Sequence, residues 1–126
     1  MALTTLAQQR AKHAWTEVEK AFQRPEFEKK FADPAKKMPA RIRASGLGQT
    51  VAFMRAKEGG DVLTAVESWC LRDMPEKARI DGLMIQFKDG DANQLRHLTA
   101  EALAYLEWLV RFADGRRKEK DARAPT

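Results

Sequence analysis

The sequence is poor in the residues that build metal and redox sites. It holds a single cysteine, Cys70, and two histidines, His13 and His97, which stand far apart and form no paired ligand motif. One cysteine cannot close an intramolecular disulfide, and it fits the reducing cytoplasm. We therefore predict a cytoplasmic protein with no metal site and no cofactor.

Long hydrophobic runs are absent as well. No stretch approaches the ~20 apolar residues that a helix needs to cross a bilayer, and the N-terminal segment lacks the features of an export signal. Hydrophobic residues make up 44% and charged residues 33% of the 126-residue chain. This composition indicates a soluble, globular protein of one domain that has no membrane partner.

Residues arranged for catalysis are also missing. The acidic residues are scattered, and their pattern brings no two of them together for acid–base chemistry. Cys70 could act as a nucleophile only if the fold placed it beside a histidine, whereas its position next to Trp69 on an apolar helix face favours a small packed residue. Residues 46–50 (GLGQT) lack the Gly-Lys-Ser/Thr ending of a P-loop. We predict no catalytic residues and no enzymatic activity.

The residues that are abundant favour helix. Ala, Leu, Lys, Arg, Glu and Gln dominate the composition, and tyrosine occurs once. Between residues 3 and 22, apolar side chains recur at three- and four-residue spacings, which predicts an amphipathic helix that Pro25 separates from the next. Trp15, Trp69 and Trp108 all fall in apolar stripes, so we predict that they anchor the core rather than stack on nucleobases.

Local signals predict where the middle helices begin and end. Asp33 followed by Pro34 predicts a new helix start, because an aspartate side chain can cap a helix and proline fits its first turn. Pro39 predicts a kink or a split in that helix, and Gly46 predicts its end. A further helix is expected over about residues 47–57.

The second half of the chain carries similar signals. Asp61 is expected to cap a helix, and the apolar run 83–87 is expected to form either a short helix or a buried strand. Thr99 predicts the cap of the last long helix, separate from a short helix before it, and Asp114-Gly115 predicts its end.

These elements predict an all-α fold. We expect a compact single-domain bundle of about six or seven helices, several of them short. Residues 1–115 are predicted to form the helical bundle domain. Residues 116–126 are charged and have no apolar anchors, so we predict that they form a flexible, mobile basic C-terminal tail.

Acidic residues are completely absent between Asp33 and Glu58. The net charge of the protein is +5, and this stretch alone holds six positive residues: Lys36, Lys37, Arg41, Arg43, Arg55 and Lys57. The rest of the chain holds 17 Lys and Arg against 18 Asp and Glu. The positive charge is therefore concentrated in one segment, and a phosphate backbone is the simplest partner for it.

A basic stretch can also be a solvated surface or part of a DNA-reading motif. A surface kept only for solubility mixes charges of both signs, which this stretch does not. The glycine turn before residues 47–57 resembles that of a helix-turn-helix regulator, but the helix after it opens with apolar residues and offers few side chains for reading bases. We therefore favour phosphate binding and keep a small helical DNA-binding regulator as an alternative.

Two segments resemble a known protein family. Residues 36–57 (KKMPARIRASGLGQTVAFMRAK) combine a basic turn, Gly-Leu, Gln-Thr and a Phe-containing helix, and residues 95–115 (LRHLTAEALAYLEWLVRFADG) end in Trp-Leu-x-Arg-Phe-Ala. In this order they resemble the small helical subunit of type III-B (Cmr-type) CRISPR effector complexes. The small subunit of type III-A complexes, which is also helical and basic, is the nearest alternative.

The resemblance implies a function and a set of partners. Subunits of this family are non-catalytic parts of an RNA-guided, RNA-targeting antiviral complex, in which stacked copies form a basic groove for target RNA paired to guide RNA. The implied partners are guide RNA, target RNA, the other subunits of the complex and further copies of the chain. The candidate residues for contact with the RNA backbone are Lys36, Lys37, Arg41, Arg43, Gln49, Arg55, Lys57 and Arg111. We expect Arg41 and Arg43 to contribute most, because Pro39 and Gly46 hold the short segment that carries them.

Overall fold

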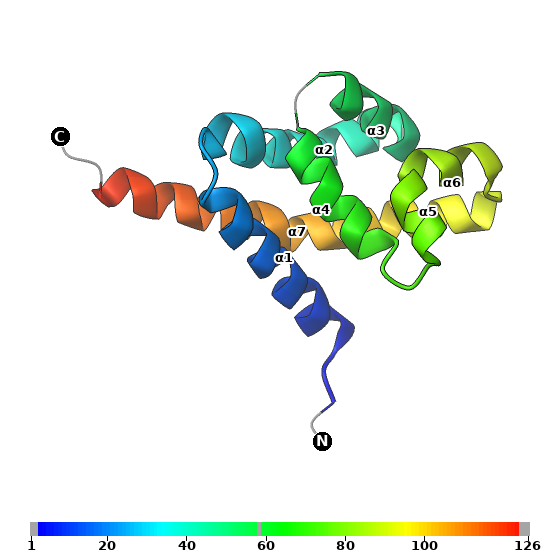
Figure 1. Cartoon of the computed structure of the whole chain (residues 1–126), viewed down its shortest axis with the longest axis horizontal. Coiled ribbons are helices and arrows are strands. Elements are labelled where there is room, and N and C mark those ends of the chain that lie inside the picture. Colours follow the sequence, from blue (N-terminus) through cyan, green and yellow to red (C-terminus); the bar gives the residue numbers. More distant parts are fainter. Residues whose placement is uncertain (1–2, 58, 124–126) are drawn as a thin grey trace.

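One long helix spans the molecule. The computed structural model describes residues 3–57 and 59–123, with side chains as far as residue 119. Helix α7 (Ala92–Arg123) has 32 residues, which at 1.5 Å per residue makes it about 48 Å long. Figure 1 shows α7 running along the length of the molecule, with α1 (Leu6–Phe22) crossing it and the other helices lying mostly above it in this view.

All regular structure in the described residues is helical. Between α1 and α7 lie one π-helical turn and five helices: η1 (Glu28–Ala32), α2 (Asp33–Ser45), α3 (Leu47–Ala56), α4 (Gly60–Cys70), α5 (Glu76–Asp81) and α6 (Leu83–Asp89). This confirms the predicted all-α bundle of about six or seven helices, several of them short. The apolar run 83–87 forms helix α6, and not a strand.

The first helix has a complete N-terminal cap. Thr5 Oγ1 accepts a hydrogen bond from the Gln8 N–H (3.0 Å), and Gln8 Oε1 accepts one from the Thr5 N–H (2.8 Å). This reciprocal pair is a capping box, and it satisfies two amides that have no partner within the helix. The helix ends at Phe22, three residues before Pro25, so the predicted separation from the next helix is confirmed.

The prediction for Asp33-Pro34 is confirmed for the start of α2 and wrong for its cap. Helix α2 begins at Asp33 with Pro34 in its first turn, but no side chain caps it, and the backbone is already helical before this point. The Asp33 N–H donates instead to the carbonyl of Glu28, five residues back, in the wide turn η1. A wide turn accommodates Pro34, which has no N–H of its own. Residues 28–45 therefore form one continuous helix, and Pro39 lies inside it without splitting it.

The predictions for the next segment are confirmed. Gly46 ends α2 with a φ of +86°, which glycine adopts without steric strain. Helix α3 follows directly and turns Leu47, Val51 and Met54 toward the core, where all three are buried.

Two other predicted helix starts are wrong. Asp61 does not cap α4, which begins after Gly59 without a side-chain cap, and the Asp61 carboxylate lies 3.4 Å from Arg24 instead. Thr99 does not begin a helix, because it lies inside α7, where its hydroxyl donates to the carbonyl of Leu95 (2.8 Å). The last two predicted helices are therefore one.

Helix α7 also continues through Gly115, where we predicted its end. An interior glycine costs a helix only about 1 kcal/mol relative to alanine. The next residue contacts α1, since Arg116 Nε lies 2.9 Å from a carboxylate oxygen of Glu19, and this contact favours the extended helix. Residues 116–123 thus belong to α7. The division of the chain into a bundle and a mobile tail stays a prediction, part of which falls on residues 124–126, outside the described residues.

A polar network joins α1, α4 and α7 inside the core. The carboxylate of Glu101 accepts hydrogen bonds from Arg10 (2.8 and 2.9 Å) and from the indole N–H of Trp69 (2.8 Å). Beside it, His13 Nδ1 lies 2.8 Å from the hydroxyl of Tyr105, whose ring stacks on Trp69. The partners come from all three helices, so the network fixes how these helices meet.

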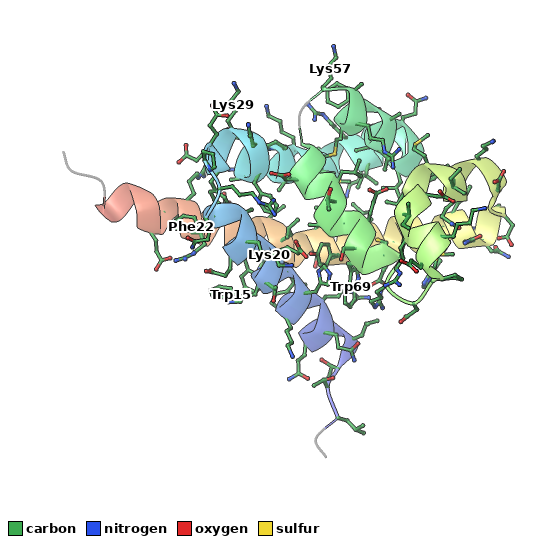
Figure 2. The ribbon with its side chains drawn as sticks, in the orientation of Figure 1. Trp15, Lys20, Phe22, Lys29, Lys57 and Trp69 are labelled. Carbon is green, nitrogen blue, oxygen red and sulfur yellow. The ribbon has the colours of Figure 1, made fainter. Side chains whose placement is uncertain are left out.

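The tryptophans do not all anchor the core. Trp69 is buried and Trp108 is partly buried against the core, but the prediction for Trp15 is wrong, because its side chain is 49% exposed. Trp15 lies about 100° around α1 from the buried Ala14, at the edge of the apolar stripe. Figure 2 shows Trp15 and Trp69 on opposite sides of α1.

Candidate nucleic-acid interface

The acid-free stretch forms most of α2, the Gly46 turn and α3, and these two helices pack against each other. Five of its six cations are exposed, and Arg41 is half-buried. The six do not share one face. One pocket is lined by Lys37, Arg41 and Lys57. Lys36 and Arg43 lie on another side of α2, and Arg55 is paired with a carboxylate.

A pocket of about 460 Å³ opens between η1, α2 and α3. Its lining consists of Lys29, Asp33, Pro34, Lys37, Arg41, Phe53 and Lys57. Lys37 and Arg41 stand four residues apart and so lie one above the other on α2, while Lys57 reaches the pocket from the end of α3. The lining thus holds four cations and one carboxylate, that of Asp33, which lies 3.8 Å from Arg117.

Arg41 and Phe53 form one wall of this pocket. The Arg41 guanidinium lies over the Phe53 ring, 4.2 Å from its centre, in a cation–π contact that links α2 to α3. The ring nevertheless remains 42% exposed. The pocket therefore offers an aromatic surface beside its positive charges.

A second hollow of about 330 Å³ continues the pocket. It is lined by Lys29, Lys30, Lys57, Gly59, Gly60 and Asp61, so Lys29 and Lys57 belong to both hollows. Figure 2 shows these two lysines projecting outward at the same edge of the molecule. We call the two hollows together the basic groove, and its cations are Lys29, Lys30, Lys37, Arg41 and Lys57.

Lys36 and Arg43 lie outside the basic groove. At 100° per residue, the two side chains are centred about 130° around α2 from Lys37 and Arg41. Both side chains are exposed. The expectation that Arg41 and Arg43 contribute most stays a prediction, and of the two only Arg41 lines the groove.

Arg55 points toward a different part of the molecule. Its guanidinium lies 3.4 Å from the carboxylate of Glu67 on α4, and the same carboxylate oxygen accepts a hydrogen bond from the N–H of Leu83 at the start of α6 (2.7 Å). Arg55 thus has a structural partner where α3, α4 and α6 meet, and it does not line the groove.

The two remaining candidates do not line the groove either. Gln49 lines a largely apolar hollow with Phe53, Met84 and Phe87. Arg111 stands two residues from each of the buried Leu109 and Ala113, which places it about 160° around α7 from either, on the exposed side.

The sequence-based candidates lack two cations of the groove, Lys29 and Lys30, and its aromatic residue, Phe53. The sequence did contain a signal for Lys29, because it precedes Lys37 by two steps of four residues and Arg41 by three such steps, and this spacing places side chains on one side of a helix. It was hidden by the interpretation of Asp33-Pro34 as a helix start, which assigned Lys29 to another helix. Phe53 carried no signal, since an apolar residue on α3 is expected in the core.

Outside the groove, the one cysteine is a packed residue of the helical bundle. Burial raises the pKa of the Cys70 thiol to about 12, so the thiol stays protonated, as expected of a packed residue. Within residues 3–57 and 59–119, no group of three His, Cys, Asp or Glu side chains could hold a metal ion. No helix in the described part of the chain is long and apolar enough to cross a membrane.

Comparison with known proteins identifies the family. The family model described as CRISPR-associated protein (Cas_Cmr5) matches residues 6–116. A protein of Thermus thermophilus named CRISPR system Cmr subunit Cmr5 is 34% identical over 90 residues, which cover 66% of this chain and 71% of that relative. The crystal structure of a CRISPR-associated Cmr5 family protein, also from Thermus thermophilus, superposes with a TM-score of 0.72 at 26% identity, covering 90% of this chain and 97% of that one.

The matches agree with the resemblance seen in the sequence. The family model spans both segments on which that resemblance rests, residues 36–57 and 95–115, and the solved structure shares the all-α fold. The resemblance to the small helical subunit of type III-B CRISPR complexes is thereby confirmed. The chain belongs to the Cmr5 family of CRISPR-associated proteins.

Proposed function

We propose that this small subunit of a Cmr-type complex binds the backbone of the guide–target RNA duplex through the basic groove, without reading its sequence. Membership of the Cmr5 family supports its assembly with other subunits of a type III-B complex. We further propose that it is non-catalytic, that it stacks in several copies along the guide RNA and target RNA, and that it works in the cytoplasm.

The basic groove is the observation that carries this proposal. It gathers five cations from η1, α2 and the end of α3, against the carboxylates of Asp33 and Asp61. Both carboxylates already have an arginine nearby, at 3.8 Å from Arg117 and 3.4 Å from Arg24. The groove therefore keeps an excess of positive charge, which favours a polyanion.

A groove of this kind suits a duplex whose sequence is read elsewhere. In an RNA-guided complex the guide selects the target by base pairing, so a protein lining the duplex needs only to recognise its shape and charge. Lysine contacts phosphate as a point charge and carries no base preference. Four of the five groove cations are lysines.

One copy should bind RNA weakly. If Lys37, Arg41 and Lys57 neutralise three phosphates, a duplex slope of roughly −0.9 per phosphate predicts that affinity falls ~40-fold between 50 and 200 mM salt. Copies held side by side in a complex would gain affinity through effective concentration. Weak binding by each copy is therefore consistent with stacking.

Two double variants of α2 test the groove. Lys37→Gln with Arg41→Gln removes two groove charges, and Lys36→Gln with Arg43→Gln removes two charges from the other side of the same helix. In the assembled complex, titrated with guide–target duplex at several salt concentrations, the groove variant should reduce the salt slope by about 1.8 for two lost phosphates. The control variant should leave the slope unchanged.

Other outcomes would favour other functions. If both double variants weakened binding equally, positive charge in general and not the groove would hold the RNA. If the wild-type protein preferred duplex DNA over the guide–target duplex in competition, the DNA-binding regulator would be favoured. Tight binding of the isolated chain to one RNA sequence at high salt would contradict the sequence-independent model.

A further inference from the structure

The exposure of Phe53 is unexplained by backbone binding alone. A phosphate backbone needs cations on a surface, whereas Phe53 contributes an aromatic ring to the wall of this pocket, and the residue as a whole is 42% exposed. Exposed aromatic side chains beside cations are the usual platforms on which proteins stack unpaired bases.

We propose that the pocket between η1, α2 and α3 holds one unpaired nucleotide of the bound RNA, with its base against the Arg41–Phe53 wall and its phosphate among the lysines. This inference rests on the proposed function and adds a ligand to the same groove. It assigns Phe53 a role in binding that the charge pattern of the sequence does not indicate.

The geometry of the wall fits a flat base. The Arg41 guanidinium carbon lies over the Phe53 ring, 4.2 Å from its centre, so one face of the ring already contacts a planar cation. Both an aromatic ring and a guanidinium plane can stack on a nucleobase. A base can therefore extend this stack from the guanidinium or contact the exposed part of the ring.

The rim of the pocket fits the phosphate. Lys29, Lys37 and Lys57 line the same pocket from three parts of the chain, and all three side chains are exposed. The volume of about 460 Å³ lies within the range of roughly 300–1,000 Å³ that is usual for small-ligand sites. An aromatic wall with a cationic rim is the chemistry of a nucleotide, which is apolar on its base faces and anionic at its phosphate.

An unpaired nucleotide is required because paired bases do not expose their faces. Inside a duplex each base is stacked between its neighbours, and a protein outside reaches only its edges and the backbone. A nucleotide that is bulged out of the duplex presents a free base face at little further cost, since it is already unstacked. The pocket should therefore distinguish a bulged duplex from a perfect one.

The test compares two RNAs and two variants. The intact protein is titrated, at about 50 mM salt, with a perfect RNA duplex and with the same duplex carrying one bulged 2-aminopurine. We expect the bulged duplex to bind about tenfold more tightly, and the 2-aminopurine fluorescence to fall on binding as the base stacks. Phe53→Leu, which keeps an apolar side chain, should reduce the ratio of the two affinities to about one, while Phe53→Trp should retain the preference for the bulged duplex.

The remaining outcomes separate this inference from the proposed function. Equal binding of both RNAs by the wild type, with the charge variants of α2 still weakening both, would overturn the nucleotide pocket and leave the groove intact. An equal loss of affinity for both RNAs in Phe53→Leu, with the preference for the bulged duplex kept, would also overturn it. If AMP bound the protein more tightly than the bulged duplex did, the pocket would serve a free mononucleotide, and its assignment to bound RNA would be wrong.

Discussion

At the residue scale, arginines of the same basic segment have different surroundings in the folded chain. Arg41 is stacked on Phe53 in the groove, whereas Arg55 is paired with Glu67 between helices. Nothing in the sequence distinguishes these arginines, because the partner of each lies on another helix. The sequence could predict that the stretch is basic, but it could not predict which of its cations are free to bind RNA.

Removing the carboxylate of the core network should destabilise the protein. Glu101→Gln leaves Arg10 as a cation without its bidentate partner beside the core, so the free energy of unfolding should fall by about 2 to 3 kcal/mol. Urea unfolding at neutral pH measures this value. Glu107→Gln, at an exposed position of the same helix, is the control and should change it by less than about 0.5 kcal/mol.

The same carboxylate predicts how stability depends on pH. Its hydrogen bond with Arg10, supported by that with Trp69, lowers the pKa of Glu101 to about 2 from an ordinary value of 4.5. The unfolded chain therefore takes up this proton first, and the stabilisation is complete above about pH 4.5 and lost as the pH falls toward 2. The difference in unfolding free energy between wild type and Glu101→Gln should shrink across this range, and a constant difference would contradict the assignment.

The Cys70 thiol should be inert. Because burial raises its pKa to about 12, almost no thiolate forms at neutral pH, and alkylating reagents should modify the native protein slowly and the unfolded protein quickly. Mass spectrometry after timed alkylation measures both rates. Cys70→Ala should bind guide–target duplex as the wild type does, and loss of binding would point to a role that the packing does not explain.

At the scale of helices and turns, local patterns predicted some features and tertiary contacts overrode others. The periodicity of the first helix, the stop at Gly46 and the inward face of α3 depend on neighbouring residues, so the sequence predicted them. Asp33 and Thr99 have the chemistry of helix caps, but neither caps a helix: α2 follows η1 without a side-chain cap, and Thr99 lies inside α7. A residue that is able to cap a helix does not always do so. Packing against other helices decides where each helix begins.

Alanine substitutions at two glycines should change the free energy of unfolding in opposite directions, which tests how tertiary structure constrains each position. Gly82 joins α5 to α6 with a φ of +79°, and a Cβ there would lie 2.4 Å from Glu67 Oε2, so Gly82→Ala should lower the free energy of unfolding by about 2 kcal/mol or more. Gly115 lies inside α7 with open space around its Cα, so Gly115→Ala should raise it by about 1 kcal/mol. Chemical denaturation measures both, and destabilisation by Gly115→Ala would contradict the continuous helix.

At the scale of the whole molecule, the fold brings only part of the basic segment into the groove that we propose as the interface. Of the eight candidates predicted from sequence, Lys37, Arg41 and Lys57 line the groove, and Lys29, Lys30 and Phe53 join them there. The family and the all-α class were predictable because they depend on patterns along the chain. The groove was not, because it depends on how η1, α2 and α3 lie against each other.

Lysine footprinting of the assembled complex tests the central claim most directly. The complex is acetylated briefly with guide RNA alone and again after target RNA has paired, and mass spectrometry measures the modification of each lysine. The groove account predicts that Lys29, Lys37 and Lys57 become protected when the duplex forms, while Lys36, next to Lys37 in the sequence but on another side of α2, reacts as before. Protection of Lys36 with no change at the three groove lysines would contradict it.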